Sequence, residues 1–267
     1  MSLKTEQRGK NILQVLLRHG NASVEDLVNL TGASAPSIRR DLARLEQRNL
    51  VHRTHGGARL AAQMQYEAFR FDSSFQIRES RFPEEKRRIG MAAAELIREH
   101  DTVGFTAGTT TTQVARCIRH RSSIHVITNA VNIAMELSNQ PALNVTLTGG
   151  TIRWAGAFSL TGPITIEMLT GVFMDKVFIG ACGVDPERGV TTIEPDEAAV
   201  FRAMVRQARQ VVVVADSSKI SMVSPALICP PTEIDVLVTD SGIAPEALEA
   251  FCARDIEVQV VSAIVPE

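Results

Sequence analysis

Apolar residues recur with the period of an α-helix along the first part of the chain. Ile12, Val15 and Leu16 share one face of a helix predicted over residues 5–18. Gly20 is expected to end this helix, because glycine is unfavourable inside helices. The first predicted element is therefore an amphipathic helix.

Two further helices are predicted within the next thirty residues. Ser23 and Asp26 have the spacing of a capping box, which indicates the start of a brief second helix. After a turn that contains glycine, Ser34 can cap a third helix, and Pro36 fits in its first turn, where no intrahelical amide hydrogen is needed. Two short helices joined by a tight turn are typical of a helix-turn-helix.

The third helix has one apolar face and one basic face. Leu42 and Leu45 fall within about 40° of Ile38 on a helical wheel. Arg40 and Arg44 project from the opposite side. One face is therefore expected to pack against the first two helices, and the other is free to contact phosphates.

A short basic hairpin is predicted directly after the third helix. Residues 50–57, LVHRTHGG, have the pattern of a strand, a basic tip and a glycine turn, which together resemble the wing of a winged helix. In such a unit the recognition helix can contact bases and the wing can contact phosphates. We predict DNA contacts from Ser34, Pro36, Ser37, Arg39, Arg40, Arg44, Arg53, His55 and Gly56. An ordinary three-helix bundle with a charged surface is the alternative.

From residue 83 onward, short apolar strands alternate with helices. The predicted strands cover residues 102–106, 124–128, 143–147, 175–180, 211–215, 234–238 and 257–261. The predicted helices cover residues 83–100 and roughly 111–119, 130–139, 162–170, 195–208 and 245–253. Strands with helices on both sides indicate an α/β fold with a mostly parallel sheet in Rossmann-like layers.

The chain is long enough for two unequal domains and a connector. We predict a winged helix-turn-helix over residues 1–59, a connector over 60–82 and an α/β domain over 83–267. The connector holds the single tyrosine and several phenylalanines, too many for a solvated tether, so we expect it to be packed.

Charge is distributed unevenly between these parts. The net charge is −2, but residues 1–59 hold 10 Lys+Arg and 5 Asp+Glu, a balance of +5, which leaves −7 for the remainder. A basic head on an acidic body favours a polyanionic partner at the head alone. On charge alone, a solvated charged face is equally good as an explanation.

Composition excludes several other classes of protein. No segment approaches the roughly 18 apolar residues that span a bilayer, and the N-terminus has no apolar signal segment, so we expect no membrane partner and a cytoplasmic, DNA-associated protein. The four cysteines are scattered and form no CxxC pair, which argues against a metal site or a disulfide framework. We expect no cofactor.

Hydroxyl-bearing residues follow the first predicted strand of the α/β domain. Glycine permits a close backbone approach there, and the start of the next helix supplies free amides and a positive dipole end. No lysine follows the glycine, so this is not a Walker loop. The pattern favours a phosphate site, and simple helix capping is the alternative. The candidate residues are Thr106, Gly108, Thr109, Thr110 and Thr111.

The ends of the other strands add polar groups of a suitable kind. Ligands of parallel sheets bind at the carboxyl ends of the strands. Arg153 and Lys219 can bind phosphate and Asp185 can bind sugar hydroxyls, whereas Glu197 competes with two neighbouring acids, Glu194 and Asp196, for a place there. The remaining candidates are Thr128, Asn129, Gly149 and Gly150.

The basic helix and hairpin carry a family resemblance. The runs SIRRDL at residues 37–42 and RTHGGA at residues 53–58 resemble the DNA-binding signature of the bacterial deoxyribose-operon repressor (DeoR) family. Ser37 stands where the family usually has threonine, and Pro36 is unusual at its position and bears on which bases are read. The resemblance implies a transcriptional regulator, in most cases a repressor of carbohydrate-metabolism genes, that binds double-stranded operator DNA as a homodimer or homotetramer.

Residues 75–261 resemble the sensor domain of the same family. That domain is similar to ribose phosphate isomerase and glucosamine phosphate deaminase and binds a phosphorylated sugar or derivative as effector. The resemblance implies that the candidate residues after the strands form this effector site. Thr106 departs from the aspartate that many members carry, which bears on the identity of the ligand.

A sugar phosphate isomerase with an accessory DNA-binding head is the main alternative. Aldose–ketose chemistry needs a carboxylate base, and Glu197 or Asp185 has the required group. However, residues 185–187 replace a deaminase-type Asp-Gly-His segment, and the six histidines lie outside the strand-end motifs. We therefore expect no catalysis. A third possibility is a ligand-binding protein whose basic head contacts another protein.

Overall fold

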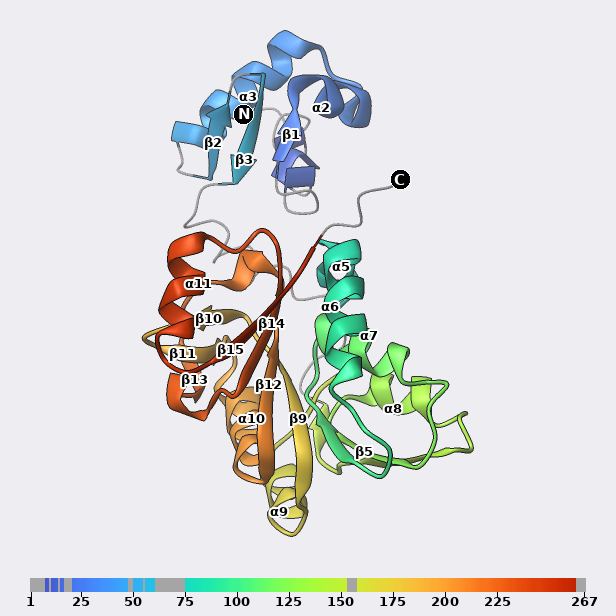
Figure 1. The fold of residues 1–267 in the computed structure, drawn as a ribbon. Helices are drawn as coiled ribbons and strands as arrows, with labels where there is room; N and C mark the ends of the chain where they lie inside the picture. Colours follow the sequence, from blue (N-terminus) through green and yellow to red (C-terminus); the bar gives the residue numbers. More distant parts are fainter. Residues whose placement is uncertain are drawn as a thin grey trace. The chain divides into compact units, whose positions relative to one another are not determined.

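The computed structural model divides the chain into two compact units, residues 1–81 and 82–267 (Figure 1). It describes residues 8–9, 11–13, 15–16, 21–47, 50–54, 56–60, 75–152 and 158–262. Each unit has a hydrophobic core of its own and is described by itself.

The N-terminal unit contains the predicted second and third helices and the hairpin. Ser23 caps the second helix, and the Asp26 side chain bonds back to the Ser23 amide, so the predicted capping box is confirmed. The elements are β1 (Asn21–Ser23), α2 (Val24–Thr31), α3 (Ala35–Gln47), β2 (Val51–Thr54) and β3 (Gly57–Leu60). Its core consists of Ile12, Leu16, Leu27, Ile38, Leu42, Leu45, Val51 and Ala58.

The hairpin pairs with a strand that the hydrophobic pattern did not predict. β3 lies between β1 and β2, and Gly57 pairs with Ser23. A Cβ atom on Gly57 would lie 2.2 Å from the Ala22 carbonyl oxygen, so only glycine permits this approach. Gly56 adopts a positive φ of 90° in the preceding turn. Glycine is therefore required at position 57 by a close backbone contact and favoured at position 56 by the positive φ of the turn.

The C-terminal unit is built on a parallel sheet, as predicted. Each of the seven predicted strands is present, with shifts of at most three residues at either end. Within the described residues the strand order is β15-β14-β12-β9-β4-β5-β6, and every neighbouring pair is parallel. The strands are β4 (Thr102–Phe105), β5 (Ile124–Thr128), β6 (Leu143–Leu147), β9 (Met174–Gly180), β12 (Ala208–Val214), β14 (Val236–Asp240) and β15 (Glu257–Val261).

Helices cover both faces of this sheet. In Figure 1, α6, α7 and α8 lie on one side, and α10 and α11 lie on the other. The predicted helix over 83–100 ends earlier than expected, because the chain tightens after residue 95 and His100 takes a positive φ of 67°. The helices of this unit are α6 (Pro83–Glu95), α7 (Thr109–Cys117), α8 (Val131–Leu137), α9 (Pro163–Thr170), α10 (Pro195–Arg206) and α11 (Pro245–Cys252), whereas α5 (Phe75–Glu79) belongs to the unit of residues 1–81.

Alternate residues of the central strands enter two separate cores. On β9, Val177 and Ile179 pack on the side of α10 and α11, whereas Phe178 packs on the side of α6 and α7. Phe178 also stacks on Phe105 of β4, with 5.2 Å between ring centroids. Burial on both faces explains why these strands are continuously apolar.

Short antiparallel pieces were missing from the prediction. β10 (Gly183–Asp185), β11 (Gly189–Thr192) and β13 (Ala226–Cys229) form a small sheet, and β7 (Thr151–Ile152) pairs with β8 (Leu160–Thr161). Strands of two to four residues are too short to show a clear period. Among the described helices, none is long and apolar enough to cross a membrane.

Candidate functional site

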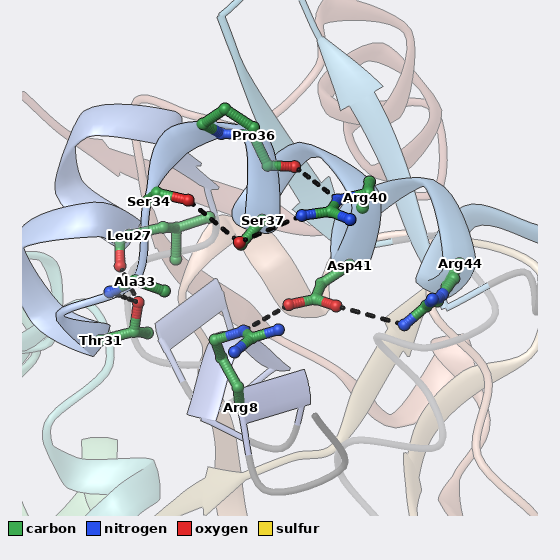
Figure 2. A network of polar contacts seen from close by, with 10 residues as sticks. All are labelled: Arg8, Leu27, Thr31, Ala33, Ser34, Pro36, Ser37, Arg40, Asp41 and Arg44. Atoms are coloured by element: carbon green, nitrogen blue, oxygen red, sulfur yellow. Dashed lines mark hydrogen bonds and ion pairs between the residues drawn. The ribbon is translucent and has the colours of Figure 1, made fainter. Parts of the chain in front are cut away.

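The start of α3 presents a row of hydrogen-bonded polar side chains (Figure 2). The Arg40 guanidinium donates from Nε to the Pro36 carbonyl at 3.3 Å and from Nη2 to the Ser37 hydroxyl at 3.5 Å. The hydroxyls of Ser34 and Ser37 lie 3.0 Å apart. Pro36 and the predicted DNA-contacting arginines of α3 are exposed, so these side chains are available to a partner.

A buried carboxylate behind this row was not predicted. Asp41 is 4% exposed and accepts from Arg8 Nε at 2.5 Å, while its other oxygen lies 3.7 Å from Arg44 Nη1 (Figure 2). The hydrogen bond to Asp41 raises the pKa of Arg8. On the helical wheel, Asp41 lies at the border between the apolar and basic faces, which is the one signal in the sequence that could have revealed it.

The wing is tied to the recognition helix by an ion pair. Arg53 Nε donates to a Glu46 oxygen at 2.7 Å, and its backbone amide donates to the other oxygen at 3.0 Å. These bonds lower the pKa of Glu46, the backbone bond most strongly. Arg53 was predicted to contact DNA, but in the free protein its charge is matched by Glu46. His55 lies outside the described residues.

In the C-terminal unit, the candidate ligand residues gather at a topological switch point. From β4 the chain runs outward to β5 and β6, then returns to β9 on the other side of β4 and continues to β12, β14 and β15. Ligands of parallel sheets bind at the carboxyl ends of the strands at such a point. Here these ends are Phe105 and Gly180.

Thr106 joins the two strand ends at this point. It is fully buried, and its hydroxyl accepts from the Gly180 amide at 3.0 Å and lies 3.4 Å from the Phe178 carbonyl. Its backbone amide donates to the same carbonyl at 3.1 Å. Thr106 was predicted to bind effector, but its hydroxyl is engaged within the sheet, which assigns it a structural contact.

Replacing Thr106 with valine is expected to lower the free energy of unfolding of the C-terminal unit by about 1–3 kcal/mol. Valine keeps the shape but leaves the buried Gly180 amide without an acceptor. Denaturant unfolding of the full chain measures the change. Thr106→Ser retains the hydroxyl and should stay close to the wild type, so an equal loss in both variants would contradict the hydrogen-bond explanation.

The threonines after Gly108 divide into two pairs. Thr111 Oγ1 donates to the Thr106 carbonyl at 2.8 Å, and Thr112 Oγ1 donates to the Gly108 carbonyl at 2.7 Å, so this pair closes the turn. The hydroxyls of Thr109 and Thr110 have no hydrogen-bond partner among the described residues. These two hydroxyls and the free amides of the first turn of α7 remain for a ligand.

Two residues at the end of β5 hold the segment after β4 in place. The Asn129 side chain accepts from the Ala107 amide at 3.0 Å and donates to Ser159 and the Leu160 carbonyl, both at 3.1 Å. Thr128 Oγ1 donates to the Phe105 carbonyl at 2.7 Å. Both residues were predicted to bind effector, and the structure shows that each also holds neighbouring backbone in place.

The glycine pair after β6 lies against the start of α9. Thr165 Oγ1 donates to the Gly149 carbonyl at 2.6 Å. Gly150 has a φ of 132°, and a Cβ atom there would lie 2.1 Å from Thr165 Oγ1. This close approach is by itself a sufficient reason for glycine at position 150, and no bound ligand is needed to explain it. Arg153 lies outside the described residues.

The charged candidates lie on three different elements. Asp185 accepts from the amides of Glu187 and Arg188 at 2.9 Å, so its carboxylate holds the β10–β11 turn. Lys219 lies in a 3₁₀ turn whose next residue bridges to β10, and Glu197 lies in the first turn of α10. Both are half-buried. Among the described residues, no group of three His, Cys, Asp or Glu could hold a metal ion.

Comparisons with known proteins match both units. A model described as the DeoR-like helix-turn-helix domain matches residues 8–64, and one described as the DeoR C terminal sensor domain matches residues 81–241. The repressor GlcR of Bacillus subtilis strain 168 is 36% identical over 92% of this chain and 91% of its own. The regulator GlpR of Haloferax volcanii is 35% identical over 91% and 92%.

About half of the chain aligns with a solved structure at a low TM-score. A ribose 5-phosphate isomerase from Methanocaldococcus jannaschii aligns with a TM-score of 0.37 and 17% identity, over 52% of this chain and 54% of that chain. The family assignment rests on the domain models and on the similar regulators, which cover nearly the whole chain. The chain therefore belongs to the DeoR family of helix-turn-helix transcriptional regulators.

Proposed function

We propose that this regulator represses carbohydrate-metabolism genes and that a phosphorylated sugar or sugar derivative modulates its binding to operator DNA. The observation that carries the ligand class is the segment over residues 106–112, which runs from the end of β4 into the first turn of α7. At the switch point of a parallel sheet lie the N-terminus of α7 and the hydroxyls of Thr109 and Thr110, which have no hydrogen-bond partner within the described part of the chain. Free amides and hydroxyls at a helix N-terminus suit a phosphate group.

The output of this regulator is the winged helix. Exposed arginines on α3 and a short hairpin offer cations to the DNA backbone and polar groups to base edges. One such unit has a small contact area, so we propose that two or four copies of the chain bind repeated half-sites. Ligand binding then selects subunit arrangements that space the recognition helices differently.

We propose that the chain carries out no catalytic turnover. The Asp185 carboxylate, one of the two candidate bases, is already engaged by two backbone amides of its own turn. Incubation of the purified protein with pentose and hexosamine phosphates tests this proposal. Turnover that disappears in a Glu197→Gln variant would identify an enzyme instead.

A thermal-shift screen of phosphorylated sugars, polyols and sugar acids tests the ligand class. A ligand at 100 times its Kd adds about 2.7 kcal/mol to the stability of the native state, which is a shift of several degrees. Lys219→Ala should reduce this shift while leaving DNA binding intact. Arg209→Ala is the matched control. Arg209 is a cation near the amino end of β12, whereas Lys219 follows the carboxyl end of the same strand.

The two variants distinguish the proposed site from a general loss of charge. An unchanged shift in Lys219→Ala would show that the pocket lies elsewhere. An equal reduction of the thermal shift in both variants would show that the sensor responds to net charge rather than to a cation at the carboxyl ends of the strands. Binding of the wild type to its own upstream DNA, with affinity that falls as salt rises, tests the DNA part independently.

A further inference from the structure

The three exposed arginines of α3 occupy different places on the helix. At about 100° per residue, Ser37, Arg40 and Arg44 fall within about 60° of one another. Arg39 lies about 100° away from Arg40 and about 140° away from Arg44. The two arginines that share a face with Ser37 are therefore the candidates for one continuous contact with DNA.

Arg40 is held at the N-terminal end of this face. Its guanidinium bonds to the Pro36 carbonyl and to the Ser37 hydroxyl, and Ser37 is itself bonded to Ser34 (Figure 2). A guanidinium has five N–H donors, so these contacts leave donors free. A side chain that is ordered before binding loses less conformational entropy when it binds. Arg40 is thus prepared for a directional contact.

Arg44 is directed away from that role by Asp41. Arg44 lies one helical turn after Arg40, and one of its nitrogens is 3.7 Å from the buried Asp41 carboxylate. Asp41 is also bonded to Arg8, so it stays in place when the helix meets DNA. In helix-turn-helix proteins the N-terminal residues of the recognition helix contact base edges. Arg44 lies beyond that part of the helix, in its last turn.

We propose that Arg40 reads a guanine in each operator half-site, with Ser37 as its positioning residue, and that Arg44 contacts a backbone phosphate. This inference rests on the DNA-binding function proposed above. Arginine binds the O6 and N7 acceptors of guanine through two parallel hydrogen bonds in the major groove. The planar guanidinium of Arg40 projects from the exposed end of the helix that enters the groove, and it is the arginine whose orientation is set by two neighbours of its own helix.

The test uses the full chain and the duplex that the wild type enriches from a random-sequence library. Arg40→Ala should lose the preference for guanine at one position of each half-site, a drop in discrimination of about 10-fold. Replacing that guanine with 7-deazaguanine should weaken the wild type and leave Arg40→Ala unaffected. Arg44→Ala should weaken enriched and scrambled duplexes by the same factor and reduce the salt slope by about 1.

Arg39→Ala serves as the matched control, since it removes an exposed arginine from a different side of the same helix. Because Arg39 is itself a predicted DNA contact, its loss should weaken enriched and scrambled duplexes by the same factor and leave the guanine preference in place. Ser37→Ala should reduce discrimination at the same base pair as Arg40→Ala, and Ser37→Thr, which retains the hydroxyl, should restore it. Thermal unfolding of the Arg39, Arg40 and Ser37 variants should match the wild type, because the replaced side chains lie outside the core.

Two different failures can be told apart. If the wild type enriches no sequence, the operator-binding function itself fails. If it enriches a duplex and Arg40→Ala retains the guanine preference, or if Arg44→Ala or Arg39→Ala loses it, the assignment of Arg40 is overturned while the regulator function stands.

Discussion

An Asp41→Ala variant is expected to lose about 3 kcal/mol of stability in the N-terminal unit, the lower end of the range for breaking a buried ion pair. The Asp41 side chain is 4% exposed and is the carboxylate partner of both Arg8 and Arg44. Its removal leaves Arg8, whose side chain is 26% exposed, without its counter-charge. Hydrogen exchange of the amides of α2 and α3 in the full chain measures this loss.

A matched control is available on the same helix. Glu46→Ala also removes a carboxylate from α3 that is paired with an arginine, but the Glu46 and Arg53 side chains are 37% and 50% exposed, far more than the Asp41 side chain. Exposed pairs contribute little to stability. Protection of the core amides should therefore fall less in Glu46→Ala than in Asp41→Ala. Equal losses of protection in the two variants would show that burial of the Asp41 pair is not the cause.

A conservative Asp41→Asn variant separates charge from shape. The amide oxygen can still accept from Arg8, but the charge that holds Arg8 and Arg44 is gone. Its stability should lie between those of the wild type and the alanine variant.

The sheet of the C-terminal unit was predictable because its strands are buried on both faces. Runs such as VVVV at residues 211–214 carry an unbroken apolar signal, and the turn that follows each strand marks its end. The antiparallel pieces around Asp185 had no such signal, since strands of three or four residues are set by tertiary contacts. Gly183, for example, is required by the Met222 carbonyl, 2.3 Å from where a Cβ atom would lie.

The candidate sites were predictable in position but not in the use of each side chain. The motif after β4 was correctly placed at the carboxyl edge of the sheet, since strand order brings these ends together. The sequence could not show that Thr106 is bonded to β9, because that contact joins residues more than seventy positions apart. Asp41 was overlooked for the same reason, since its partner Arg8 lies on another helix.

Replacing Phe178 with alanine is expected to cost about 3–5 kcal/mol of the free energy of unfolding of the C-terminal unit. Phe178 is fully buried on the central strand β9 and stacks on Phe105. Removing its ring leaves a cavity between the sheet and the helices that cover it. Because domains of this kind are stable by roughly 5–15 kcal/mol, the unit should unfold at a much lower denaturant concentration.

Phe173 supplies the matched control, because it lies five positions earlier and its side chain is 82% exposed. Phe173→Ala should change the midpoint of unfolding by no more than the scatter of surface substitutions, about 0.5 kcal/mol. The carbonyl of residue 178 accepts from the Thr106 amide, so a cavity at Phe178 also loosens the loop that leads into α7. Phe178→Ala should therefore weaken the ligand-induced thermal shift. A shift of wild-type size would show that packing around Phe178 does not affect ligand binding by residues 106–112.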